Sequence, residues 1–540
     1  MILLSSKKPF NRGNLSKGER KHVKGSGCRD IKSINPRKLS FFILNQYFSE
    51  KSNLKLLLNK SLKKYDLSEL DKRFVFEVVK GTVRYFIRID FLISLFSNKK
   101  VESIDKDVLN ILRQALYQLL YMDKTPAYAA INESVEIAKK HIGIYSSRFV
   151  NAVLRKINAA TGLSDFLNSS IQKTFIKPAE RLSALYSYPE WLAEYWIKSY
   201  GPDRTALLFE LLNHEPQVFI RVNRLKTDKK ELISLFEESG MAQNRDFLPE
   251  PPHGNIDGME SLKKTGLFDD CMILKSVQNI EIIPGYLHGD FSVQDFSSQF
   301  AVKYFLDPVK HDKILDICSA PGGKATYTAE LTDDKAEVVS VDNNKKKMNL
   351  FKENIARLGI KNITFINADV TGQDFLGQNR FDNYFDKIFI DAPCSAMGTI
   401  SKNPDAKYAG TLSDMERLAE ITEKILSASD KYLKPGGKII LYKCTLSKIE
   451  NQETVKKFIE QNPGKYGIDY PFSGYTGIFD STSVLQENSK ISEDYNLKKA
   501  NMLQMEPCLR PLFEKDPLFE IMPDYFSSEA GFVCILKKSA

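Results

Sequence analysis

Two cysteines of this chain stand shortly after apolar runs that are typical of β-strands. Cys394 belongs to the segment Asp391-Ala-Pro-Cys394, which follows the run Lys387–Ile390. Cys444 follows the run Lys438–Leu441. A single buried cysteine is usually an inert small hydrophobic residue, but two cysteines at strand ends would meet in one cleft. A thiolate in that cleft would be suited to attack an electrophilic ring carbon, which is covalent catalysis.

A glycine turn lies upstream of these cysteines, between another apolar run and a helical pattern. The run Lys313–Ile317 leads into Cys318-Ser-Ala-Pro-Gly-Gly-Lys324 and then into a helix. This turn is not the GxGxxG turn that wraps a dinucleotide pyrophosphate, so a nicotinamide cofactor is disfavoured. Its two glycines let the backbone close on a compact ligand. The candidate cofactor-binding residues here are Cys318, Ser319, Ala320, Pro321, Gly322, Gly323 and Lys324.

Aspartates follow three strand-like runs of the same region. Asp342 ends the run Glu337–Val341, and Asp369 follows the run Ile363–Ile366. A carboxylate at the end of the second strand accepts ribose hydroxyls in nucleotide-binding sheets, and Asp369 is expected beside an adenine. Asp391 reaches the same cleft and is a candidate for both cofactor binding and catalysis. We therefore predict a nucleoside cofactor without phosphates, of which S-adenosylmethionine is the common one.

A methyl donor beside two thiols suits methylation of C5 of a pyrimidine. That carbon is too weakly nucleophilic to attack a sulfonium methyl group unaided. Addition of a thiolate at C6 converts the ring into an enamine that can make the attack. The candidate catalytic residues are Cys444, Cys394, Asp391 and Lys324.

The alternation of strand and helix patterns predicts a doubly wound α/β, Rossmann-like sheet for residues 301–540. Ligands bind outside the carboxyl ends of the strands in such sheets, and the candidate residues all fall there. Residues about 475–510 are polar and weakly patterned, which indicates an insertion of unassigned role. A final hairpin is expected from Phe519–Met522 and Gly531–Lys537.

Three segments precede this sheet in the sequence. Residues 1–34 are basic with almost no apolar side chains, which predicts a flexible arm that contacts phosphates. Residues 35–165 carry apolar stripes of helical period, which predict an all-α domain. Because that domain offers no candidate catalytic group, we expect it to contribute RNA affinity and target choice rather than chemistry.

Residues 166–300 indicate connector helices and a small α+β unit that binds RNA. A helix is expected with Pro189 in its first turn, and Trp191 and Trp196 are interpreted as packing residues. Val218–Arg224 alternates like a strand and Lys230–Gly240 like a helix. Arg221, Asn223 and Arg224 are candidates for RNA contact, although ordinary surface polarity fits them equally well.

The composition limits the partners of the protein. The chain has 540 residues and a formal net charge of +9, which favours a polyanionic partner, although a merely solvated surface fits as well. Seven cysteines without a CxxC pair and six scattered histidines give neither a disulfide framework nor zinc spacing, so no metal is expected. No apolar run of about eighteen residues and no secretory leader is evident, so we expect a cytoplasmic protein without membrane contact.

Five helical motifs resemble the NusB-like RNA-binding domain. These motifs are Asp71-Lys-Arg-Phe74, Gly81-Thr-Val-Arg84, Leu112–Leu119, Ala130-Ile-Asn-Glu133 and Phe149–Arg155. Together with the Pro-Cys segment, the run Asn403-Pro-Asp405 and the motif Tyr442-Lys-Cys-Thr-Leu446, they make the chain similar to the Sun family of RNA (cytosine-C5)-methyltransferases. The resemblance covers residues from about 35 onward and implies a class I methyltransferase domain.

The resemblance also implies roles for particular residues. Cys444 would be the nucleophile, Cys394 would assist product release, and Asp391 would engage N3 of the cytosine. Lys324 would be the lysine of the first motif. Cofactor contacts would come from the loop Cys318–Lys324, Asp342 and Asp369. The expected substrate is ribosomal RNA, in particular 16S rRNA, with a tRNA or another structured RNA as the alternative.

Two departures from the family pattern and two alternative functions accompany this interpretation. Lys443 stands where the family usually has threonine, and Met397 where it often has a small or hydroxyl residue. One alternative is a non-catalytic RNA-binding or ribosome assembly factor, but the joint presence of Asp342, Asp391 and both cysteines argues against it. The other is a nucleophile in the Pro-Cys segment, as in DNA cytosine methyltransferases, but no Glu-Asn-Val partner motif is evident.

Overall fold

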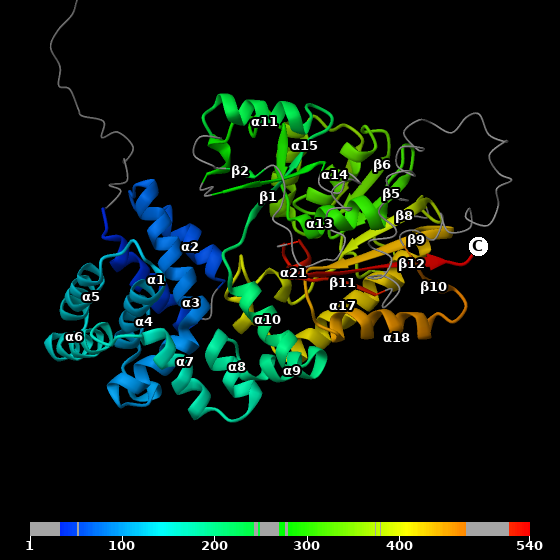
Figure 1. Cartoon of the computed structure of the whole chain (residues 1–540). Coiled ribbons are helices and arrows are strands. Elements are labelled where there is room, and N and C mark those ends of the chain that lie inside the picture. The colour runs from blue at the N-terminus through cyan, green and yellow to red at the C-terminus, as the bar shows by residue number, and fades with distance from the viewer. Residues whose placement is uncertain are drawn as a thin grey trace, which may run out of the picture.

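The computed structural model describes residues 33–50, 53–241, 247–248, 269–275, 279–372, 374–377, 380–470, 518–526 and 528–540. The expected insertion at about 475–510 and all but the last two residues of the expected basic arm lie outside the described residues. Figure 1 shows three parts: a helical domain in blue and cyan, a small sheet in green, and a large sheet with flanking helices in green to red.

The helical domain forms because each of its longer helices buries one apolar stripe. Val108, Leu112 and Leu116 lie on the buried face of one helix and pack with Val150 and Leu154 of another. The Ser68 hydroxyl accepts a hydrogen bond from the Asp71 amide (3.1 Å), which caps the longest helix. The helices are α1 (Pro36–Glu50), α2 (Leu54–Leu62), α3 (Glu69–Ser97), α4 (Lys106–Tyr121), α5 (Ala127–His141) and α6 (Ile144–Asn158).

Connector helices join this domain to the rest of the chain. They are α7 (Leu163–Thr174), α8 (Pro178–Tyr186), α9 (Glu190–Tyr200) and α10 (Pro202–Asn213). Trp196 is fully buried against Phe209, and Trp191 is half-buried against the same apolar cluster, so both are packing residues as predicted. Pro189 is the N-cap residue that precedes α9, whereas the sequence predicts it in the first turn of the helix. Met397 of the large-sheet domain is buried in the same cluster, so this core spans two parts of the molecule.

The small sheet has four antiparallel strands in the order β2-β3-β1-β4. Its elements are β1 (Val218–Val222), α11 (Lys229–Glu238), β2 (Phe247–Leu248), β3 (Cys271–Leu274) and β4 (Phe291–Val293). The expected strand and helix of this unit are therefore present. Asp228 and Glu231 form a capping box that fixes the start of α11.

The large sheet runs in the order β10-β12-β9-β8-β5-β6-β7, with β11 paired to β12. The strands from β7 to β9 are parallel, and β10, β11 and β12 are joined by antiparallel pairing. The strands are β5 (Lys313–Ile317), β6 (Glu337–Val341), β7 (Ile363–Ile366), β8 (Phe385–Asp391), β9 (Leu433–Lys443), β10 (Tyr466–Asp469), β11 (Phe519–Ile521) and β12 (Gly531–Lys538). The expected final hairpin is the β11–β12 pair.

Helices cover both faces of the large sheet, as a doubly wound fold requires. The helices α13 (Phe296–Phe300), α14 (Gly323–Leu331) and α15 (Lys345–Leu358) pack on the face that carries Ile314. The helices α17 (Leu412–Ser429) and α18 (Thr454–Gln461) pack on the face that carries Leu315. Because β5 has β6 on one side and β8 on the other, the chain order reverses at β5, and the ligand crevice of such folds opens there.

Two strands are longer than the apolar runs indicated. β9 begins at Leu433 and includes a polar, glycine-containing stretch, and β8 begins at Phe385 with an irregularity in register before Lys387. The apolar pattern misses these extensions because polar or glycine residues follow the buried Phe385 and Leu433 and interrupt it. Among the described helices, none combines the length and the apolar composition that a bilayer span needs.

Candidate active site

The two cysteines meet where β8 and β9 end. These strands are parallel neighbours, with Asp391 opposite Tyr442 in the register, so the residues that follow them leave the sheet at the same edge. The sulfur of Cys394 lies 3.4 Å from the sulfur of Cys444, and both thiols are free and half-buried. A disulfide needs about 2.05 Å, so this separation is that of a hydrogen-bonded thiol pair.

Gly398 allows this close approach of the two loops. Its amide donates to the Cys444 carbonyl (3.0 Å), and its carbonyl accepts from the Ala530 amide (3.1 Å). A Cβ atom at this position would lie 1.9 Å from the Ala530 carbonyl oxygen. Only glycine therefore fits between the two backbones.

Lys324 and Asp391 form an ion pair beside the thiols. The Lys324 ammonium lies 2.7 Å from Asp391 Oδ2 and 5.0 Å from the centre of the Tyr442 ring. Burial lowers the pKa of Lys324, but the Asp391 carboxylate outweighs burial and the net pKa lies above its ordinary value. The Tyr442 hydroxyl is held by the Ser297 hydroxyl (2.9 Å). Lys324 is thus a fixed, charged group at the base of the site.

The Cys444 thiol has a perturbed pKa. Its hydrogen bond with Cys394, then burial, and then the nearby Asp391 and Glu529 carboxyl groups raise its pKa well above the ordinary thiol value. Cys444 is therefore protonated at neutral pH in the structure described, and it must lose this proton before it can act as a nucleophile.

A buried polar cluster holds the Pro-Cys loop to the turn after Cys444. The Glu450 carboxylate accepts from the Ser395 amide (2.9 Å) and the Ser395 hydroxyl (2.5 Å). The Ser395 hydroxyl also contacts Thr445 Oγ1 at 2.8 Å. Lys443, the departure from the family pattern, is fully buried and its ammonium donates to the Glu450 carbonyl (2.6 Å). Lys443 therefore helps to hold Glu450, and with it the Pro-Cys loop, in place.

A cavity of about 680 Å³ opens at the carboxyl ends of the parallel strands, which is a size suited to a small-molecule ligand. Seven of the residues predicted from the sequence line it together: Cys318, Ala320, Asp342, Asp369, Asp391, Cys394 and Cys444. The other predicted residues, Ser319, Pro321, Gly322, Gly323 and Lys324, are not among its lining residues.

These other residues shape the glycine turn. The Ser319 hydroxyl donates to Asp316 Oδ2 (2.5 Å), and the Asn354 amide group donates to the Pro321 carbonyl (3.3 Å). Gly322 has a φ of +95°, and a Cβ atom there would lie 2.5 Å from the Phe351 ring. Gly322 is thus required both by its conformation and by the close approach of α15.

The carboxylates of the cavity suit a cationic nucleoside. Asp342 Oδ1 accepts from the Asn344 amide (2.8 Å) and Oδ2 from the Ala320 amide (3.1 Å), and each oxygen keeps a lone pair for a ligand hydroxyl. Asp316 is buried next to the turn, and its Oδ1 has no partner among the described residues. Burial raises the pKa of Asp316 to about 7. Asp369 is exposed and accepts two hydrogen bonds from Thr371, which lower its pKa.

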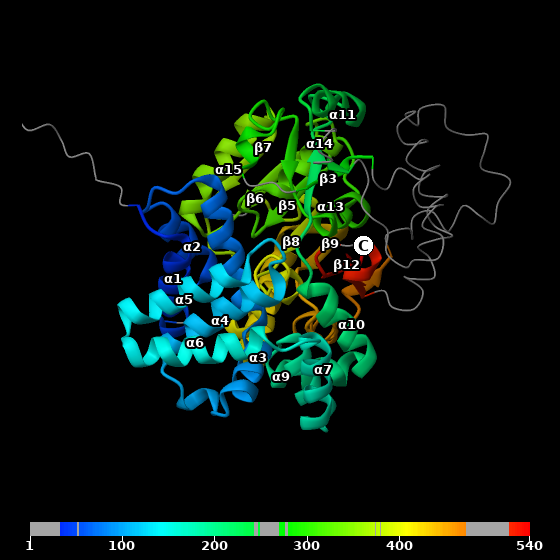
Figure 2. The same cartoon turned by 60° about the vertical axis from the view of Figure 1, so that its left-hand side comes forward.

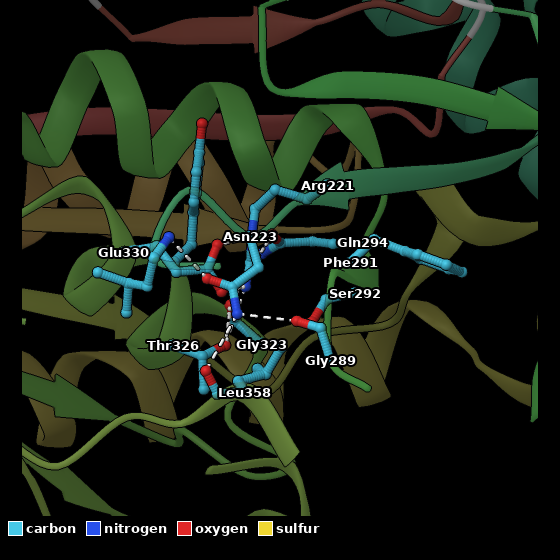
Figure 3. Close-up of polar contacts among 12 residues, drawn as sticks. Arg221, Asn223, Gly289, Phe291, Ser292, Gln294, Gly323, Thr326, Glu330 and Leu358 are labelled. Carbon is cyan, nitrogen blue, oxygen red and sulfur yellow. Dashed lines mark hydrogen bonds and ion pairs between the residues drawn. The ribbon is translucent and has the colours of Figure 1, made fainter. Parts of the chain in front are cut away.

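The structure corrects the predicted RNA contacts of Arg221 and Asn223, as Figure 3 shows. Arg221 is fully buried, and its guanidinium lies 2.6 Å from the Glu330 carboxylate of α14. It also donates to the Gly323 carbonyl (2.8 Å). Asn223 is fully buried and donates to the carbonyls of Gly289 (2.8 Å) and Leu358 (3.0 Å). Arg221 thus joins the small sheet to the glycine turn and α14, and Asn223 joins it to α15.

The alternation of residues along β1 indicates that Arg221 is buried. Arg221 lies two residues after Phe219 and so shares its face, and Phe219 packs in the core on the α14 side of the large sheet. Arg224 is half-exposed and pairs with Asp270 at 3.5 Å, so its predicted RNA contact stays a prediction.

Family comparisons agree with the three parts of the molecule. Residues 303–486 match the model described as 16S rRNA methyltransferase RsmB/F. Residues 34–159 match the NusB family, and residues 188–250 match the ferredoxin-like domain of RsmF/B-like methyltransferases. These domains and the sheet topology define a class I methyltransferase that carries a NusB-type domain.

Individual relatives extend the match over nearly the whole chain. A probable ribosomal RNA small subunit methyltransferase B of Bacillus subtilis (strain 168) is 31% identical, over 94% of this chain and 100% of the relative. A protein of the same description from Synechocystis is 30% identical, over 79% of this chain and 90% of the relative. The crystal structure of PH0851 has the same fold, with a TM-score of 0.65 and 20% identity over 94% of this chain and 100% of that one. The chain belongs to the RsmB/F family of 16S rRNA methyltransferases, which confirms the predicted family and fold class.

We predict that Arg221→Met lowers the free energy of unfolding by about 3–5 kcal/mol, because it leaves the Glu330 carboxylate buried without its partner. It should also weaken cofactor binding, since the Gly323 carbonyl loses its donor. Chemical denaturation and calorimetry would measure the two effects. Arg224→Met serves as the control and should change stability by about 0–1 kcal/mol. Equal stability of the two variants would contradict the assigned role of the buried pair.

Proposed function

We propose that this protein transfers a methyl group from S-adenosylmethionine to C5 of a cytosine in small-subunit ribosomal RNA. The observation that carries the proposal is the pair of thiols, 3.4 Å apart, at a cavity that is also lined by Asp342 and Asp391. Family membership supports ribosomal RNA as the substrate. The thiol pair supports the pyrimidine C5 position, because that carbon needs covalent activation.

In this proposal Cys444 is the nucleophile. Its thiol first loses its proton to the solvent. The resulting thiolate forms a bond to C6 of the cytosine, and the electrons of the C5–C6 double bond become available at C5. S-adenosylmethionine, when bound, supplies the electrophilic methyl group that C5 attacks. The buried Glu450 cluster holds the Cys444 loop in one position, so the thiolate is already oriented for attack on the ring.

Cys394 completes the reaction by assisting product release. C5 and C6 are bonded neighbours, so a second sulfur 3.4 Å from the first is within reach of C5 once Cys444 is bonded to C6. As a thiolate, whose own proton has gone to the solvent, Cys394 can then accept the C5 proton and become a thiol. The double bond re-forms, the bond from C6 to the Cys444 sulfur breaks, and the thiolate of Cys444 is regenerated.

Asp391 and Lys324 orient the base. A protonated Asp391 carboxyl group would donate to N3 of the cytosine, where negative charge develops as C6 is attacked. Lys324 is 2.7 Å from Asp391 Oδ2 and fixes the position of this carboxyl group. The cavity lining would hold the cofactor, with Asp342 at the ribose hydroxyls and Asp369 near the adenine. Its positive charge suits the acidic lining.

We expect the two cysteine variants to fail differently. Cys444→Ala should yield neither product nor protein–RNA adduct, because the ring is never activated. Cys394→Ala should transfer the methyl group and then accumulate an adduct that survives denaturing electrophoresis and disappears on nuclease digestion. Cys271→Ala, which removes a buried thiol of the small sheet, is the control and should turn over normally. Interchanged behaviour would move the nucleophile to Cys394, and full turnover by both variants would refute thiol catalysis.

We also expect Asp342→Ala to weaken S-adenosylmethionine binding by about 1.5–3 kcal/mol, the contribution of a charge-assisted hydrogen bond. Calorimetry with the full chain would measure this loss. Asp382→Ala removes a carboxylate at the amino end of β8, where it pairs with Lys431 at 3.3 Å, and should leave cofactor affinity unchanged. Unaltered affinity in Asp342→Ala would show that this residue does not hold the ribose.

A further inference from the structure

Helix α3 of the helical domain contacts the chain segment that follows the Pro-Cys loop. The Arg84 guanidinium donates to the Ser401 carbonyl (2.6 Å), and the Lys80 ammonium donates to the Lys402 carbonyl (2.9 Å). Arg84 is buried, whereas Lys80 is half-buried. In Figures 1 and 2 the helical domain lies beside the large-sheet domain in both views. These two bonds are made to backbone carbonyls seven and eight residues after Cys394.

The segment is held again a few residues later. Lys407, in the short helix α16 (Ala406–Ala409), is fully buried and donates to the Arg84 carbonyl (3.1 Å) and to Asn213 Oδ1 (2.6 Å). The Tyr408 hydroxyl donates to the Ser187 carbonyl (2.9 Å). The segment therefore lies between α3 and the connector helices, and it is fixed from both sides.

On its other side the same segment reaches the catalytic centre. The Lys402 ammonium lies 3.0 Å from Asp295 and 3.0 Å from Glu529. The Lys402 amide donates to the Thr399 carbonyl (3.0 Å), so residues 399–402 form a closed turn. The neighbouring Gly398 amide donates to the Cys444 carbonyl. An unbroken path of hydrogen bonds and short turns thus connects α3 with both cysteines.

Arg88 provides a contrast on the same helix. Its guanidinium donates to the Leu185 carbonyl (2.6 Å) and to Asn168 Oδ1 (2.8 Å), both in the connector helices. Arg88 therefore joins the helical domain to the connector without contacting the Pro-Cys segment. Arg84 and Arg88 are chemically alike, but only Arg84 of these two binds the segment that carries Cys394.

We propose that Arg84 and Lys80 are positioning residues of the methyltransferase reaction, which hold residues 394–402 so that the Cys394 thiol stays beside the Cys444 thiol. The inference deepens the proposed function and rests on it. It also changes the role expected for the helical domain, which contributes to the geometry of the catalytic centre as well as to RNA binding. Since a displacement of about 1 Å can cost two orders of magnitude in rate, loss of these bonds affects turnover more than RNA affinity.

The test compares Arg84→Met, Lys80→Met and the matched control Arg88→Met in the full chain. We expect Arg84→Met to reduce kcat at least about tenfold while the KM for RNA changes less than about threefold. The pH profile of Cys394 alkylation, followed by mass spectrometry, should shift relative to the parent. Arg84→Lys keeps a donor and should recover part of kcat. Arg88→Met should match the parent in kcat and in the alkylation profile.

The alkylation profile separates failure of this inference from failure of the proposed function, because it needs neither RNA nor methyl transfer. If Arg84→Met and Lys80→Met lower only the melting temperature, and their kcat and alkylation profile match those of Arg88→Met, the contacts are interdomain packing and the inference is overturned. If Arg84→Met does not fold, the half-buried Lys80→Met decides the question by the same two measurements.

Discussion

The parallel pairing of β8 with β9 is the constraint on which the proposed catalytic centre depends. Parallel neighbours end at the same edge of the sheet, so the loops after Asp391 and Tyr442 must leave side by side. The 3.4 Å approach of the two sulfurs then requires only that these loops be drawn together. Gly398 does this with a backbone hydrogen bond to Cys444, and the Glu450 cluster does it with side chains. The other domains act on this arrangement by holding the same loops or the glycine turn.

Buried charge joins the parts of the molecule. Arg221 and Glu330 are both completely buried, so each would be costly to desolvate without the other. Such a pair adds little net stability compared with apolar packing. It nevertheless disfavours other arrangements of the two side chains, because these would leave a buried charge unpaired. Its extra bond to the Gly323 carbonyl makes the glycine turn part of that arrangement. The small sheet therefore fixes the shape of the cofactor cavity without lining it.

The sequence was most informative where structure is local. β5 and β6 coincide with short apolar runs, because strands buried on both faces leave a continuous apolar signal. β7, a partly exposed strand at the edge of the sheet, also coincides with its predicted run. The candidate residues that follow these strands are predictable, because parallel strands end at the same edge of the sheet. Arg221 was assigned to the surface because a lone arginine usually lies there, and its partner Glu330 is 109 residues away. The contact of Arg84 with Ser401 spans 317 residues, and no local pattern reports it.

The position of β12 sets the order in which this catalytic centre can be assembled during translation. β12 lies between β9 and β10, and the adjoining Ala530 amide bonds to Gly398 next to the thiols. The ribosome has therefore synthesised Cys394 and Cys444 well before the strand that secures them, and until then β9 presents an open edge. The helical domain has its own core and can fold early. The nascent chain can thus fold its helical domain first and bring its two thiols together last.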